Sequence, residues 1–143
     1  MSVRVDFAFG APNRLRTTCD VVRKHYLAGR KLIIYQSDSR ELLRLDRMLW
    51  GFEPTAYIPH VMVEDPLANQ TPILLCQHAD ALTTPVYPEA WLINLDQQGP
   101  PLPSSFTRIL EIVSNQESDK SFARQRWRHY QQHGYALHSH NLA

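Results

Sequence analysis

Glycine is scarce in this chain of 143 residues, and its placement excludes the common phosphate-binding loops. The five glycines lie at positions 10, 29, 51, 99 and 134. They cannot form a G-x-G-x-x-G fingerprint, a P-loop or a G-x-S-x-G nucleophile elbow. Such loops hold phosphates with rows of backbone N–H groups, which this sequence does not offer. A divergent nucleotide site near Gly10, Asp38 or Asp96, in a Rossmann-like nucleotide-binding enzyme, remains the alternative.

Cysteine is equally scarce, which bears on disulfides and metal sites. Cys19 and Cys76 are the only two, too few for a disulfide framework or a four-thiolate zinc site, and we expect both to be buried thiols. His129 and His133 have the spacing of metal ligands on a helix, but Tyr130 stands where zinc proteases carry a glutamate. We therefore expect solvated histidines, with no catalytic residue, no metal and no cofactor.

The chain also lacks a charge excess and a long apolar run. Fifteen Lys and Arg face fourteen Asp and Glu, which argues against a protein that grips duplex DNA by its phosphates. Asp6 interrupts the apolar start of the chain, and no later run approaches membrane-spanning length. We expect a cytoplasmic protein without membrane contact, folded as a single domain over residues 1–143.

Strand and helix patterns alternate along the chain. Apolar strand patterns occupy residues 3–9, 32–35, 56–63, 72–76 and 91–95, and Pro59 marks the third as an edge or a bulge. Helical spacing of apolar residues predicts helices over 15–29 and 106–113, and a helix that carries Leu42, Leu45 and Leu49, is capped by side chains within 37–41 and stops at Gly51. A further helix is predicted over 118–134. A last short strand is predicted at 135–137, with His138 and His140 in a frayed tail. The order predicts an α/β fold, a Rossmann-like three-layer sandwich whose mostly parallel sheet is flanked by helices.

A cationic row on the last helix is the first candidate binding surface. Lys120, Arg124 and Arg128 are four residues apart and share one side of the helix, with Trp127 beside them. Arginine can bind a carboxylate through two N–H groups, and an aromatic ring can form the floor of a pocket. The pattern fits an acidic peptide with an apolar anchor. A solvated helix face with Trp127 half-buried as part of the core remains the alternative.

Aromatic residues crowd around the end of the second predicted helix and the segment that follows it. Trp50, Phe52 and Tyr57 lie within eight positions of one another, which could create an apolar surface for a partner chain. Composition alone favours packing of these rings in the core.

The ordered motifs of the chain resemble the chi subunit family of bacterial DNA polymerase III. They run over nearly the whole sequence: Leu45-Asp-Arg-Met-Leu-Trp50, Tyr57-Ile-Pro-His60, Pro72-Ile-Leu-Leu75, and Ala123-Arg-Gln-Arg-Trp-Arg-His-Tyr130 before Gly134-Tyr135. The resemblance implies a Rossmann-like fold without a nucleotide site. It also implies a non-catalytic subunit that bridges the psi subunit of the clamp-loader complex and the acidic C-terminal tail of single-stranded DNA-binding protein, and so meets DNA only indirectly.

The resemblance also implies positions for both binding sites. The tail site falls on Val113, Lys120, Arg124 and Trp127. Arg128 is added because it belongs to the same cationic row of the helix. The psi site falls on Trp50, Tyr57, Ile58, Pro59 and His60.

Overall fold

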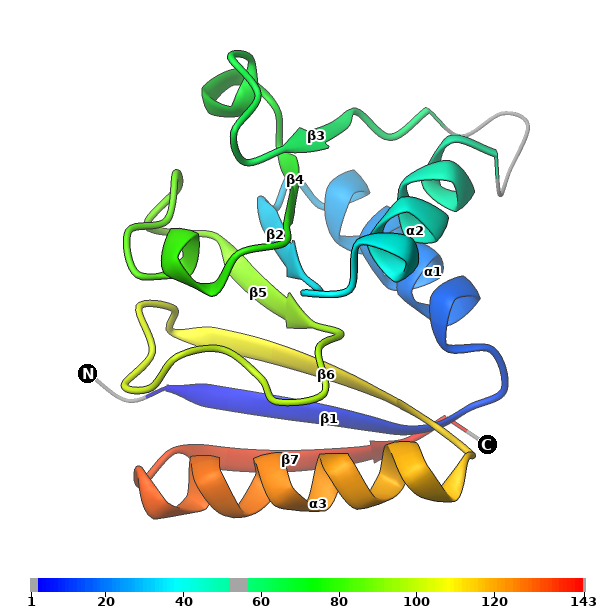
Figure 1. Ribbon diagram of the computed structural model, residues 1–143, viewed down its shortest axis with the longest axis vertical. Helices are drawn as coiled ribbons and strands as arrows, with labels where there is room; N and C mark the ends of the chain where they lie inside the picture. The colour runs from blue at the N-terminus through cyan, green and yellow to red at the C-terminus, as the bar shows by residue number, and fades with distance from the viewer. Residues whose placement is uncertain (1–2, 52–56, 143) are drawn as a thin grey trace.

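A computed structural model describes residues 3–51 and 57–142 and shows an α/β sandwich with a parallel sheet (Figure 1). The strands are β1 (Arg4–Ala11), β2 (Leu32–Tyr35), β3 (His60–Met62), β4 (Ile73–Cys76), β5 (Trp91–Asn94), β6 (Arg108–Ser114) and β7 (Ala136–Asn141). The helices are α1 (Arg14–Leu27), α2 (Ser39–Gly51) and α3 (Glu117–Gln132), with 3-10 turns at Ala68–Gln70 and Ala79–Leu82. The predicted fold class is confirmed.

The seven described strands are all parallel and lie in the order β3-β4-β2-β5-β6-β1-β7. β3 and β7 are therefore the edges, as Pro59 indicated for the first of them. Helices α1 and α2 cover one face, where Leu42, Leu45 and Leu49 of α2 are buried. Helix α3 covers the other face beside β7 (Figure 1) and buries Ala123, Arg126 and Tyr130.

Residues 106–113 do not form the predicted helix: they contribute to β6, a strand between β5 and β1. Both faces of this strand are covered, so its apolar residues do not alternate with polar ones. Ile109, Leu110 and Val113 also fit a helical period, which is why spacing alone misleads here. The β-branched Ile109, Ile112 and Val113 favour the strand.

The C-terminal segment is also more ordered than predicted. His138 and His140 do not belong to a frayed tail, since β7 continues to Asn141 and pairs along its length with β1. His140 Nε2 lies 3.0 Å from Asp6 Oδ1, which ties this strand to its neighbour through side chains as well. The prediction failed because the strand is polar and gains its stability from pairing with β1.

A buried ionic cluster fastens α3 to the sheet. Glu111 of β6 is fully buried and accepts hydrogen bonds from Arg126 Nε at 3.0 Å, Tyr130 Oη at 2.7 Å and Asn94 Nδ2 at 3.1 Å. Burial raises the pKa of Glu111, although Arg126 and these hydrogen bonds oppose the shift. The cluster fixes which side of α3 faces outward.

Candidate functional site

A pocket lies between α3 and strands β1 and β7, next to Arg124 and Arg128 of the predicted cationic row. Its volume is about 350 Å³, and its lining comes from three elements, namely Phe9 of β1, Ser139 of β7, and Ala123, Arg124, Trp127 and Arg128 of α3. Trp127 is half-buried, with its ring centroid 5.0 Å from that of Phe7 in the core. The ring thus packs on the core and also lines the pocket.

The cationic side chains around this pocket differ in whether they already form an ion pair within the described part of the chain. Arg124 and Arg128 are exposed, and neither forms an ion pair with any residue that the structure describes. Lys120 is half-buried and lies 3.6 Å from the carboxylate of Glu117, so part of its charge is already compensated. The pocket therefore combines an apolar hollow with two guanidinium groups that form no ion pair with a described residue. This combination is suited to a carboxylate next to an aromatic or aliphatic side chain.

Val113 does not belong to the surface of this pocket. It is fully buried on β6, in the same apolar cluster as Ala123 and Trp127. It supports α3 from beneath. Sequence reasoning missed the opposite wall, Phe9 and Ser139, because these residues lie more than 100 positions from each other along the chain and meet only through the pairing of β1 with β7.

The second predicted surface lies where α2 ends and β3 begins. The Trp50 side chain is 48% exposed and that of Tyr57 is 68% exposed, with ring centroids 5.6 Å apart. Pro59 is half-buried. Phe52, the third aromatic of this group, lies outside the described residues.

Ile58 and His60 have a different position from their neighbours. Ile58 is buried in the core beside α2, and His60 is 3% exposed beneath Trp50 at a centroid distance of 4.2 Å. The His60 ring is held on both sides, by the Ile58 carbonyl at 2.7 Å and by Asp46 Oδ1 at 3.1 Å. His60 thus supports the exposed ring of Trp50 from below, and Ile58 belongs to the core.

Leu43 extends this surface, and sequence reasoning missed it. It is 47% exposed and lies seven residues before Trp50, two helical turns along the same side of α2. The signal was present in the sequence, because Leu43 falls outside the buried stripe of Leu42, Leu45 and Leu49.

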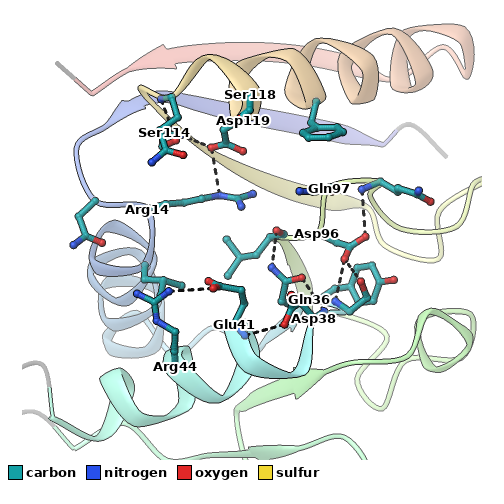
Figure 2. A pocket seen from close by; sticks show the side chains of 18 of the residues that line it. Arg14, Gln36, Asp38, Glu41, Arg44, Asp96, Gln97, Ser114, Ser118 and Asp119 are labelled. Carbon is teal, nitrogen blue, oxygen red and sulfur yellow. Dashed lines mark hydrogen bonds and ion pairs between the residues drawn. The ribbon is translucent and has the colours of Figure 1, made fainter.

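A large polar cleft lies at the carboxyl ends of the strands (Figure 2), where open α/β sheets usually bind ligands. Its volume is about 1290 Å³, and the loops after β1, β2, β5 and β6 form it. It brings together Asp38 and Asp96, two of the three candidate positions for a divergent nucleotide site, but Gly10 does not line it. Four carboxylates, on Asp38, Glu41, Asp96 and Asp119, outnumber the two guanidinium groups of Arg14 and Arg44.

Most of these charged groups already have partners within the chain. Arg14 extends from the start of α1 toward Asp119 (Figure 2), with an N–O distance of 3.8 Å, and its Nε donates to the Ile112 carbonyl at 2.8 Å. Asp96 accepts hydrogen bonds from the backbone and side chain of Ser37 and from the Gln98 backbone. A cleft with this excess of acids is poorly suited to phosphates.

Metal-binding and thiol chemistry find little support in the described part of the chain. Residues 3–51 and 57–142 contain no group of three or more His, Cys, Asp or Glu placed to hold a metal ion. His129 and His133 are both exposed. Burial raises the pKa of Cys19 to about 12 and that of Cys76 to about 11, so both remain protonated and unreactive at neutral pH.

None of the helices described is long and apolar enough to span a membrane. The fold and its surfaces define an α/β protein without a phosphate loop, with a cationic aromatic pocket on α3 and an exposed aromatic surface beside α2. The chain belongs to the DNA polymerase III chi subunit family, whose model matches residues 1–138.

Three curated relatives carry the name DNA polymerase III subunit chi. The protein from Pseudomonas aeruginosa is 29% identical over 90% of this chain and 87% of its own length. The Haemophilus influenzae protein is 26% identical over 87% and 84%, and the Escherichia coli protein 22% identical over 83% and 79%. The family resemblance recognised in the sequence is confirmed, and with it a role as a subunit of the replicative polymerase assembly.

Proposed function

We propose that this chain is a non-catalytic, cytoplasmic subunit that links the clamp-loader complex to single-stranded DNA-binding protein. It binds the acidic C-terminal tail of that protein in the α3 pocket and the psi subunit on the aromatic surface of α2. Contact with DNA is then indirect, through these partners. The observation that carries the proposal is a single pocket in which an apolar hollow adjoins the guanidinium groups of Arg124 and Arg128, which form no ion pair with any described residue.

The pocket fits the chemistry of such a tail. A C-terminal residue brings a free carboxylate, and an aromatic side chain at that position needs a hollow from which water is excluded. Arg124 lines the pocket and is the candidate residue to bind the carboxylate, while Trp127 supplies an apolar wall. Arg128 and Lys120 attract the preceding acidic residues over a distance of about 8–10 Å at moderate ionic strength.

The aromatic surface fits a protein partner. Trp50 and Tyr57 expose large rings, and the Trp50 ring packs on the buried His60 and on Tyr57. Exposed aromatic residues are typical anchors of protein interfaces. Leu43 adds apolar area on the same side of α2. This surface and the α3 pocket lie on elements that cover opposite faces of the sheet, so both partners can be bound at once.

The test is a fluorescence titration with a labelled tail peptide. We expect Arg124→Ala to weaken binding by about thirtyfold, near 2 kcal/mol, because the variant loses a charged contact at the centre of the site. Arg40→Ala is the matched control, since it removes an exposed arginine on α2 and should leave the affinity unchanged. Lys120→Ala or Arg128→Ala should cost less and reduce the salt dependence. Equal affinity for wild type and Arg124→Ala would contradict the assignment.

A further inference from the structure

β7 forms an open edge of the sheet. The even-numbered residues of β7 direct their backbone N–H and C=O groups toward β1. The hydrogen bonds from Ala136 N to Val3 O (2.9 Å) and from Leu142 N to Phe9 O (2.8 Å) show this. The intervening residues therefore direct their backbone groups away from β1. Within the described residues β7 pairs with β1 alone, which leaves the N–H and C=O groups of Leu137 and Ser139 without a strand partner.

This edge lacks the usual protection against further pairing. The opposite edge, β3, has three residues and follows directly after Pro59, features that discourage the addition of another strand. β7 has six residues, Ala-Leu-His-Ser-His-Asn, and contains neither proline nor lysine nor a carboxylate. Long unprotected edges of this kind are templates for an extended peptide.

The open edge is continuous with the α3 pocket. Ser139 lines the pocket, and its partner in the register, Phe7, is buried in the cluster under α3. The side chains of Leu137 and Ser139 thus point to the α3 side of the sheet, and their free backbone groups border the pocket. A peptide anchored in the pocket reaches these groups without crossing any other element.

We propose that the acidic segment before the anchored C-terminal residue adds to β7 as an extra strand. Its alternate side chains would then face the two sides of the sheet, toward Arg124 and Arg128 on one side and toward the exposed His138 and His140 on the other. β7 has no charge that repels a carboxylate, and Asp6 beneath it is paired with Arg4 and Arg108. This inference rests on the proposed binding of an acidic tail, and it specifies how the backbone of that tail is held.

Amide hydrogen exchange of the whole protein, followed by NMR, tests the proposal. The probe is a synthetic ten-residue peptide of alternating Asp and Ser that ends in Phe with a free carboxylate. At saturation we expect exchange at the Leu137 and Ser139 amides to slow by about tenfold or more, because each gains a hydrogen bond. The His138 and His140 amides are the internal control, since they already bond to β1 and should change little.

Peptides with single N-methyl groups provide the matching test from the other partner. N-methylation should weaken binding by about tenfold at every second position, where the peptide N–H faces β7. At the positions between them, where the N–H points away from β7, it should weaken binding by less than about twofold. Saturable binding without protection of Leu137 and Ser139, or with equal loss at every methylated position, would overturn the added strand. Protection that grows with protein concentration in the absence of peptide would instead assign the edge to a second copy. Failure of the unmodified peptide to bind would refute the proposed tail site itself.

Discussion

Removing Arg126 should destabilise the protein severely, because this residue neutralises a carboxylate that water cannot reach. The side chain of Arg126 is 2% exposed and that of Glu111 is 0% exposed, at an N–O distance of 3.0 Å. Loss of one partner of a buried ion pair costs about 3–5 kcal/mol. That is a large share of the roughly 5–15 kcal/mol by which domains are stable. We expect Arg126→Met to lose this amount in urea denaturation followed by tryptophan fluorescence.

The double variant Glu111→Gln with Arg126→Met is the control for this prediction. Glutamine keeps an acceptor for the Tyr130 hydroxyl and is uncharged, so no buried charge is left without a partner. We expect the double variant to be more stable than Arg126→Met by about 2 kcal/mol or more, a strong coupling between the two positions. A loss below about 1 kcal/mol in Arg126→Met, or strictly additive losses, would refute the reasoning.

The pH dependence of Arg126→Met provides an independent check. Burial raises the pKa of Glu111 above its unfolded value, so a protonated Glu111 favours the folded state. The stability that this protonation contributes is present at low pH and is lost as the pH rises through the folded pKa. Loss of the Arg126 charge should raise that pKa further. As the pH rises above the unfolded pKa of Glu111, the free energy of unfolding of Arg126→Met should therefore fall more steeply than that of the double variant.

Three further predictions concern Asp6, the aromatic surface and the cleft. Burial tends to raise the pKa of Asp6, but hydrogen bonds from Arg4 and His140 and the charge of Arg108 lower it from 3.8 to about 2. Its contribution of about 2 kcal/mol is present above pH 3.8 and is lost as the pH falls toward 2, so Asp6→Asn should flatten the acid limb of a stability curve. Tyr57→Ala should abolish capture of the psi subunit in a pull-down with little change in melting temperature, whereas a collapse in stability would place Tyr57 in the core. Calorimetry should detect no micromolar binding of ATP, GTP or dinucleotides, and a saturable isotherm would revive the nucleotide-site alternative.

Sequence reasoning was most reliable where local pattern and tertiary environment agree. The compact apolar run at 32–35 matches β2 residue for residue, and the stripe of Leu42, Leu45 and Leu49 faces the core as predicted. It failed for β6 and β7, whose form depends on their neighbours. β6 loses its alternation because it is covered on both faces, and β7 has almost no apolar signal of its own.

For the candidate sites, too, the sequence predicted relations within one helix but not those that depend on packing between elements. Helical spacing predicted that Arg124, Trp127 and Arg128 lie side by side, and in the structure all three line one pocket, because residues on one helix have a fixed relation to each other. Spacing could not distinguish exposed from buried members of a motif. Val113 and Ile58 belong to the core, and only the packing of the sheet reveals it. The bond between Glu111 and Arg126, which orients α3, joins two elements and was not predicted.

The carboxyl-end cleft differs from the ligand site of nucleotide-binding α/β proteins in the state of its helix N-termini. In nucleotide-binding relatives of the architecture, helix N-termini at this edge offer free backbone N–H groups to phosphates. Here the chain itself occupies two of them, since Asn13 Oδ1 accepts from the Arg16 amide of α1 and Asp38 Oδ1 accepts from the Arg40 and Glu41 amides of α2. At the third helix, Asp119 is bound to the Ser114 amide and lies next to Arg14.

The caps of Asn13 and Asp38 stabilise their helices and occupy amides that a phosphate would need, and the charged Asp38 also repels a phosphate. A phosphate entering the cleft would have to displace a carboxylate from its amide partners and would meet the remaining acids of Glu41 and Asp96. The pocket between α3 and strands β1 and β7 carries the opposite sign of charge, since Arg124 and Arg128 line it and form no ion pair with a described residue. The electrostatics of the described residues therefore favour an acidic ligand in this pocket over one in the usual ligand site of the fold.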